Sequence, residues 1–174
     1  GIALPLPGQA TTTMNDRLEK GIAAQVKIFG EHMNEAWKAG TVNRYLAANC
    51  FGDYYTRTGL SLAQREIITF CFLAAQGGCE PQLTSHAGAN LRIGNDNAFL
   101  IQVISQCLPY IGYPRSLNAL RCVNDAAQAA INDFDVLAAN TAELRRIIDD
   151  GLVQPLDLAN IPNTRQQLPR FTVY

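Results

Sequence analysis

The stretch SLAQREIITFCFLAAQGG, which begins at Ser61, constrains the fold more than any other part of the chain. Ser61 and Gln64 match a capping box, in which each side chain bonds the other residue's backbone N–H, and the glycine pair at the end supplies a stop. Beyond its first turn the stretch is apolar almost all round, which is typical of a helix buried in a core. We therefore predict a core helix over residues 61–76.

Helical periodicity continues through most of the remaining chain. Apolar residues recur at helical spacing in one segment after another, and no segment shows convincing strand alternation over several turns. Pro81 suits the first turn of one helix, Asn95 can cap the next, and the Gly-Tyr-Pro at 112–114 breaks the chain. The further helices that we expect cover 14–29, 32–38, 43–55, 81–93, 95–109, 114–131 and 141–150. The predicted fold class is all-α.

The length of 174 residues is close to that of one domain and is enough to bury a substantial core. Residues 1–13 contain prolines, glycines and threonines before any periodic pattern, so we expect an extended lead-in. We place the helical domain at 14–150. Residues 151–174 carry three prolines and no helical period and are predicted to form an irregular tail, whose last four residues could add to a sheet edge or lie on a partner subunit.

Charge and cysteine content limit the classes of function. The 14 basic and 15 acidic residues form no block of either sign, so nothing argues for nucleic acid or an anionic membrane, and no apolar run is long enough to span a bilayer. None of the five cysteines falls in a CxxC pair, which argues against a disulfide framework or a metal site made of thiolates. Reduced cysteines favour a cytoplasmic protein. Because the chain does not begin with Met, a removed export signal is left open.

The stretch CEPQLTSH, from Cys79 to His86, places one thiol and one of the two histidines seven residues apart at the start of a predicted helix. The spacing of Cys79, Gln82 and His86 puts them along one helix face. A helix N-terminus stabilises a thiolate, and histidine transfers protons near neutral pH. Glu66 is an isolated acid in the core helix, and a buried carboxylate needs a partner or a proton. The pattern is compatible with a proton relay.

Ordinary packing accounts for the same residues, and both interpretations stay open at this point. Glu66 can favour the helix dipole and pair with Arg65, and a histidine on a helix is more often a hydrogen-bonded structural residue than a catalyst. Arg57 and Arg92 are typical of helix-end or surface charges, although either could bind a carboxylate substrate.

The remaining polar and sulfur residues carry no recognisable motif. His32 is interpreted as a surface helix residue, and Cys71, Cys107 and Cys122 lie among apolar neighbours as core cysteines do. No phosphate-binding glycine loop, HExxH or GxSxG is found, so hydrolase, kinase and dinucleotide-binding functions have no support.

Residues 51–120 resemble the carboxymuconolactone decarboxylase family, which includes the alkyl hydroperoxidase D proteins. Four ordered elements carry the resemblance: FGDYYTR, then GL-L--RE at the core helix, a histidine two turns into the next helix, and YIGYPRSLNAL. The resemblance implies an AhpD-like all-α fold, an orthogonal helical bundle that assembles into homo-trimers or homo-hexamers. It also implies a small-molecule substrate and no cofactor.

Two activities occur in this family. The decarboxylase branch removes CO2 from a carboxylated muconolactone. The hydroperoxidase branch uses a glutamate and the pattern CxxCxxxH, which corresponds here to Glu66, Cys79 and His86. Gln82 occupies the position of the second cysteine, so the standard dithiol peroxidase cycle lacks its resolving sulfur unless the fold brings Cys71 or Cys50 within disulfide range of Cys79.

The resemblance makes a decarboxylase-type enzyme the leading prediction, with no metal. His86 would be the general acid and base and Glu66 would orient it. Gln82 and an arginine, Arg57 or Arg92, would bind the substrate.

Two alternatives remain. The first is a thiol-dependent peroxidase, with peroxiredoxin-like antioxidant activity, in which Cys79 attacks the hydroperoxide. The second is a non-catalytic helical oligomer, in which Arg65 or the backbone satisfies Glu66 and no pocket leads to His86.

Overall fold

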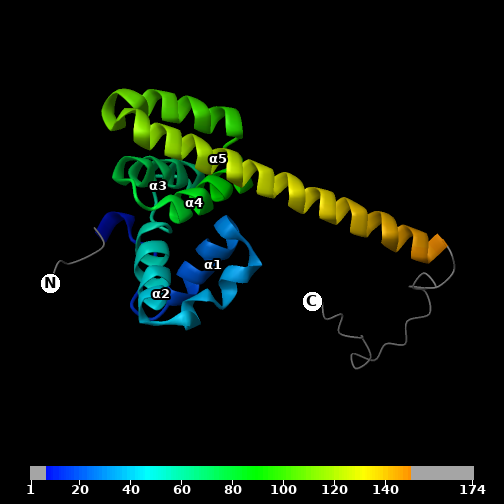
Figure 1. Cartoon of the computed structure of the whole chain (residues 1–174). Coiled ribbons are helices and arrows are strands. Elements are labelled where there is room, and N and C mark those ends of the chain that lie inside the picture. Colours follow the sequence, from blue (N-terminus) through cyan, green and yellow to red (C-terminus); the bar gives the residue numbers. More distant parts are fainter. Residues whose placement is uncertain (1–6, 150–174) are drawn as a thin grey trace, which may run out of the picture. The chain divides into compact units, whose positions relative to one another are not determined.

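The computed structural model describes residues 7–149, which form helices and connecting turns and contain no strand (Figure 1). The all-α prediction is therefore confirmed. The chain divides into two compact units, Gly1–Asn132 and Asp133–Tyr174. The first unit carries all the candidate site residues. None of the helices in the described range is long and apolar enough to cross a membrane.

The elements follow one another in a simple order. They are the 3-10 helix η1 (Pro7–Gln9), α1 (Arg17–Phe29), the 3-10 helices η2 (Glu31–Asn34) and η3 (Ala36–Ala39), α2 (Thr41–Tyr45), the π-helix η4 (Leu46–Tyr54), α3 (Leu62–Gln76), α4 (Glu80–Arg92) and α5 (Asn97–Asp149).

The core helix α3 forms as its sequence predicts. The Gln64 backbone N–H donates to Ser61 Oγ at 3.2 Å, and the Ser61 N–H donates to Gln64 Oε1 at 2.9 Å. The helix ends at Gly77, whose φ of 67° is a left-handed conformation that glycine adopts without strain. Strong local signals at both ends thus fix the position of α3 in the sequence.

The region before α3 differs from the prediction in detail. The helix expected over 32–38 is two short 3-10 helices, and the one expected over 43–55 is α2 followed by the wider turns of η4. Gly21 of α1 explains how closely η4 packs, because a Cβ there would clash with the backbone oxygen of Ala47. Arg17 and Asp53 form an ion pair between the same two elements.

The sequence predicts Asn95 as the cap of the helix after α4, and this prediction is wrong. The Asp96 Oδ1 accepts from the Phe99 N–H at 2.8 Å and takes the capping role. The Asn95 side chain instead donates to Ala63 O at 3.1 Å and to Asn90 Oδ1 at 2.7 Å, because α3 and α4 leave these acceptors within its reach.

The predicted breaks in the last helical region are only partly correct. Gly112, with a φ of 76°, interrupts α5, as the Gly-Tyr-Pro predicted. The predicted gap between 131 and 141 is wrong, since the helix runs through it. No glycine or proline occurs from Arg115 to Asp149, so nothing stops the helix there. The tail 151–174 and the predicted helix end at Asp150 lie outside the described residues, as does the start of the lead-in, 1–6.

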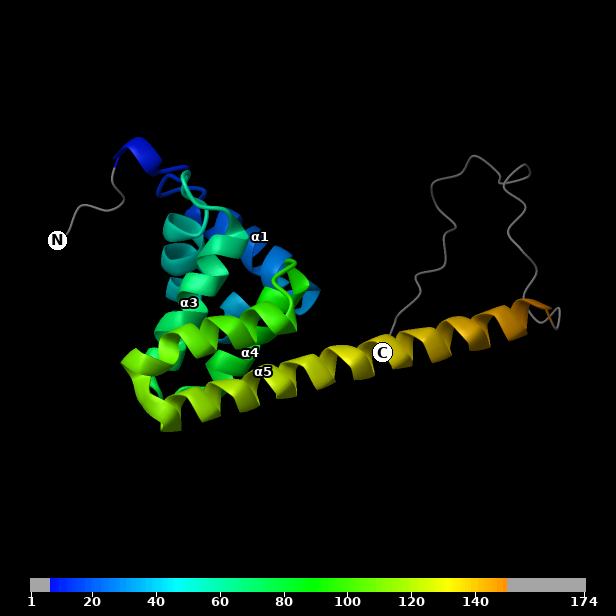
Figure 2. The ribbon, with the colours of Figure 1, turned by 90° about the horizontal axis from the view of Figure 1, so that it is seen from above.

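Helices α3 and α4 form a layer with a different core on each side (Figures 1 and 2). One side packs against α5 through a purely apolar cluster: Phe70, Ala74, Leu83, Ala87, Leu100, Ile104, Ala119, Cys122, Val123 and Ala126. The other side meets α1 and η4 through a smaller cluster of Ile28, Phe51, Tyr55 and Ala89. We call these the α5 side and the α1 side.

Candidate active site

The candidate active site is centred on one carboxyl–imidazole contact between α3 and α4. Glu66 Oε2 lies 2.7 Å from His86 Nδ1. The Glu66 side chain is completely buried, whereas the His86 side chain is 15% exposed. The pair is therefore an internal acid and an imidazole that still has one open edge.

This contact fixes which imidazole nitrogen is available. A carboxylate that accepts from Nδ1–H holds the neutral ring in the tautomer that leaves the Nε2 lone pair free. The Phe29 ring meets the imidazole edge-on, with centroids 5.2 Å apart, and limits its rotation. Nε2 is consequently the atom that can take up and release a proton.

Asn90 holds the two backbones of this pair together. It is fully buried, and its Nδ2 donates to His86 O at 2.7 Å and to Glu66 O at 3.3 Å. Asn95 in turn donates to Asn90 Oδ1 and to Ala63 O. Sequence reasoning missed this network, because an asparagine within a helix gives no sign of what it faces.

His86 opens into a cavity of about 450 Å³ on the α1 side. Apolar and aromatic side chains make up most of its wall, with a few polar groups among them. The lining residues are Gln25, Phe29, His32, Met33, Leu46, Cys50, Phe51, Tyr55, Thr69, Leu73, Pro81, Gln82, Ser85 and His86. Such a wall suits a small molecule that is mainly hydrocarbon and carries a few polar groups.

The carboxylate of Glu66 influences its neighbours across the cavity wall. Burial, and then the charge of Glu66, raises the pKa of the Cys50 thiol. The same two causes raise the pKa of Tyr55 well above its usual value, although its hydroxyl pairs with Thr69 Oγ1 at 2.6 Å. Cys50 and Tyr55 therefore stay protonated near neutral pH and can act as hydrogen-bond donors rather than as anions.

Cys79 does not share this cavity. Its thiol donates to Leu73 O at 3.4 Å and lines a separate narrow recess with Gly77, Arg115 and Asn118. Cys79 faces elsewhere because it is the N-cap of α4, with φ −132° and ψ 39°. Its backbone is not helical, so helical spacing does not predict the direction of its side chain. The common face predicted for three residues holds for Gln82 and His86 alone.

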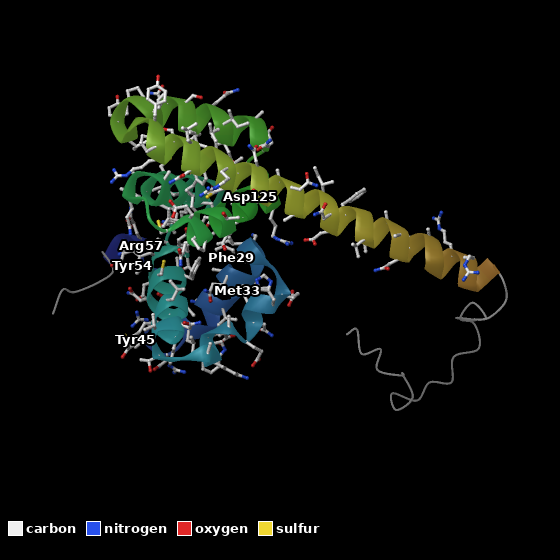
Figure 3. All side chains as sticks on the ribbon, in the orientation of Figure 1. Phe29, Met33, Tyr45, Tyr54, Arg57 and Asp125 are labelled. Carbon is white, nitrogen blue, oxygen red and sulfur yellow. The ribbon has the colours of Figure 1, made fainter. Side chains whose placement is uncertain are left out.

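The arginines that were predicted to bind a carboxylate also lie elsewhere. Arg57 stacks over the Tyr54 ring at 4.6 Å from its centroid, and Figure 3 shows this pair apart from Phe29 and Met33 of the cavity. Arg92 ends α4 with its guanidinium near Gly30. Among the described residues, no lysine or arginine lines the cavity.

Sequence reasoning missed several cavity residues. His32 is exposed, as its interpretation as a surface residue predicted, but it also lines the cavity from η2. Gln25 is 2% exposed, and its Oε1 has no hydrogen-bond partner within the described part of the chain. Gln25 lies between Gly21 and Ile28 on the buried face of α1, so a polar residue at a buried helical position was the one available signal.

The described residues contain no group of three or more histidine, cysteine, aspartate or glutamate side chains that could hold a metal ion. Glu66 and His86 are paired with each other. The arrangement can transfer protons.

Comparison with known proteins identifies the class of domain. Residues 41–125 match the sequence model of the carboxymuconolactone decarboxylase family. The matched segment runs from α2 into α5 and includes Glu66, Cys79 and His86. Residues 41–125 therefore match the family that the resemblance indicated. No curated protein sequence matches the chain.

Proposed function

We propose that the first unit is a cofactor-free acid–base enzyme of the decarboxylase type, acting on a small organic acid or lactone. The observation that carries this proposal is the 2.7 Å contact between buried Glu66 and His86, whose ring lines the 450 Å³ cavity. A histidine oriented by a carboxylate and facing a substrate-sized cavity is equipped for general acid–base catalysis.

The proposed chemistry needs one proton at Nε2 of His86. When the bond from carbon to the carboxylate breaks, CO2 leaves and the electron pair stays on the substrate as a dienolate or carbanion. The protonated imidazole donates its Nε2 proton to that carbon, and solvent restores the proton for the next cycle. Glu66 stabilises the imidazolium and holds the ring in position.

The apolar wall supports loss of CO2 in a second way. A compact carboxylate is poorly solvated among side chains such as Phe51 and Leu73, whereas CO2 and a delocalised dienolate are less dependent on water. Gln82 and Ser85 supply polar contacts beside His86. We assign substrate orientation to these two residues in place of Arg57 and Arg92.

The thiol peroxidase with Cys79 has weaker support. The thiol donates to a backbone carbonyl in a recess that His86 does not line. The non-catalytic alternative expected Arg65 or the backbone to satisfy Glu66 and no pocket to lead to His86. Arg65 instead donates to the carbonyls of Arg57 and Thr58, Glu66 contacts His86, and His86 lines the cavity. Both observations favour the acid–base enzyme. The trimer or hexamer implied by the resemblance stays a prediction, which light scattering would check.

The test is an assay with a carboxylated muconolactone in D2O, followed by NMR. We expect CO2 release with one deuterium incorporated at the protonated carbon, and loss of both in His86→Gln. Parallel assays with hydrogen peroxide and cumene hydroperoxide, with and without an added thiol, address the alternative. Peroxide turnover that disappears in Cys79→Ser, with no decarboxylation, would contradict the proposal.

A further inference from the structure

The α5 side of the molecule holds a second cluster of reactive groups, away from the cavity of His86. Cys71 of α3 and Cys107 of α5 both line an apolar groove of about 420 Å³. The rest of the groove is formed by Ile67, Ile68, Phe72, Ala75, Tyr110 and Ile111. Two thiols from different helices thus open into the same space.

We propose that Cys71 and Cys107 are a dithiol site that an organic hydroperoxide oxidises to a disulfide within the chain. The other three cysteines are placed differently. Cys50 lies in the cavity of His86, and the thiols of Cys79 and Cys122 donate to the backbone oxygens of Leu73 and Glu80. Cys71 and Cys107, by contrast, both line the same groove.

Electrostatics support the close approach of the two sulfurs. Burial, followed by the charge of Cys107 and a hydrogen bond with it, raises the pKa of the Cys71 thiol to about 11. Cys71 therefore remains a thiol near neutral pH, and in our proposal it takes the resolving step after the attack by Cys107.

The groove is accessible and selects for an apolar oxidant. Both cysteines are only partly buried. At the rim, Phe72 and Tyr110 are 72% and 81% exposed. Hydrocarbon walls favour a hydroperoxide with an alkyl or aryl group over hydrogen peroxide, because burial of the apolar group adds to binding.

The reaction balances in two steps. The Cys107 thiolate attacks the terminal oxygen of the hydroperoxide, the O–O bond breaks, and Cys107 sulfenic acid and an alcohol form. The Cys71 sulfur then attacks the sulfenic sulfur, the S–S bond forms and water leaves. The two sulfurs together lose two electrons to the hydroperoxide, and a small dithiol such as dithiothreitol returns them.

The test uses the full chain and does not depend on decarboxylase activity. Protein is treated with cumene hydroperoxide, alkylated with N-ethylmaleimide, and measured by intact mass and peptide mapping. We expect two of the five thiols to escape alkylation, with recovery after dithiothreitol. The disulfide should also raise Tm by about 5–15 °C, because it restrains the unfolded chain.

Variants identify the pair. One tryptic peptide contains both Cys71 and Cys79, so the Cys79→Ser variant is the matched control and should keep the cross-link to the Cys107 peptide. Cys71→Ser and Cys107→Ser should each lose it, with circular dichroism as the check on folding. Five alkylated thiols in the treated wild type, loss of the cross-link in Cys79→Ser, or a cross-link only between two chains would each overturn the proposal.

A slower reaction with hydrogen peroxide than with cumene hydroperoxide supports the apolar groove as the binding site, and the reverse order overturns that assignment.

Discussion

The two sides of the α3–α4 layer are built from the same two helices and yet differ in kind. On the α5 side, Leu83 and Ala87 of α4 join a cluster made only of apolar residues. On the α1 side, Gln82 and His86 of the same helix meet a cavity, with Glu66 buried behind the imidazole. Along α4, the residues on the α5 side therefore provide stability, whereas those on the α1 side leave room for a ligand.

The comparison shows how one helix can serve both purposes. Leu83 and Ala87 are four residues apart, as are Gln82 and His86, so each pair forms its own stripe along α4. Cys79 precedes both stripes at the N-cap and belongs to neither cavity nor core. A shift of one residue along α4 thus separates a structural side chain from a candidate catalytic one.

The largest effect is expected at the imidazole. His86→Gln should lower kcat for the decarboxylase-type reaction by about 10²–10⁴-fold, because the general acid is lost. Cys79→Ser, on the same helix but outside the cavity, is the control and should leave kcat unchanged. Steady-state kinetics with a carboxylated muconolactone measures both, and equal losses in the two variants would remove the distinction between the two positions.

The next effect tests the α5 side. Leu83 is 3% exposed, so Leu83→Ala should lower the free energy of unfolding by about 2–5 kcal/mol through lost burial and a cavity. Its neighbour Gln82 is exposed toward the cavity, and Gln82→Ala should change stability by less than about 0.5 kcal/mol. Urea denaturation measures the difference. Similar losses from both substitutions would show that the two stripes do not face different surroundings.

A smaller loss of stability is expected where the network joins α3 to α4. Asn90→Ala removes the donor to the carbonyls of Glu66 and His86 and should cost about 1–3 kcal/mol. Thermal unfolding measures this cost. If Asn90 positions the site, the variant should also lower kcat in protein that is fully folded at the assay temperature. A stability loss with unchanged kcat would make Asn90 purely structural.

The smallest effect concerns the part of α4 that faces neither core. An added Cβ at Gly88 meets no atom within 4 Å. Because alanine favours the helix, Gly88→Ala should raise the free energy of unfolding by about 0.5–1 kcal/mol. A loss of stability in the same urea series would indicate that this surface of α4 is covered, as it would be in a homo-oligomer.

Local signals explain which parts of the fold were predictable. The capping box and the terminal glycine locate α3 without any tertiary information, and a single acid in that apolar helix pointed to Glu66 as a buried group in need of a partner. By contrast, the predicted gap between residues 131 and 141 was wrong. The sequence has no glycine or proline there that would stop α5. Asn95 had the right residue type for a cap, but tertiary acceptors compete for its side chain.

The candidate site was predictable only where helical geometry applies. Glu66 and His86 lie within helices, so the side that each one faces follows from its position. Cys79 has non-helical dihedral angles, and Arg57 lies in the turn before α3, so no periodicity describes them. His32 and Gln25 come from the α1 region, whose packing against α4 depends on contacts distant in the sequence.

The central claim is that Glu66 holds the imidazole of His86 with Nε2 facing the cavity. Long-range ¹H–¹⁵N NMR of the two histidines, assigned with a His32→Asn variant, tests it directly in the neutral form of the ring. We predict that His86 carries its proton on Nδ1 and that Glu66→Gln weakens this preference. A proton on Nε2 in the wild type, unaffected by Glu66→Gln, would contradict the account.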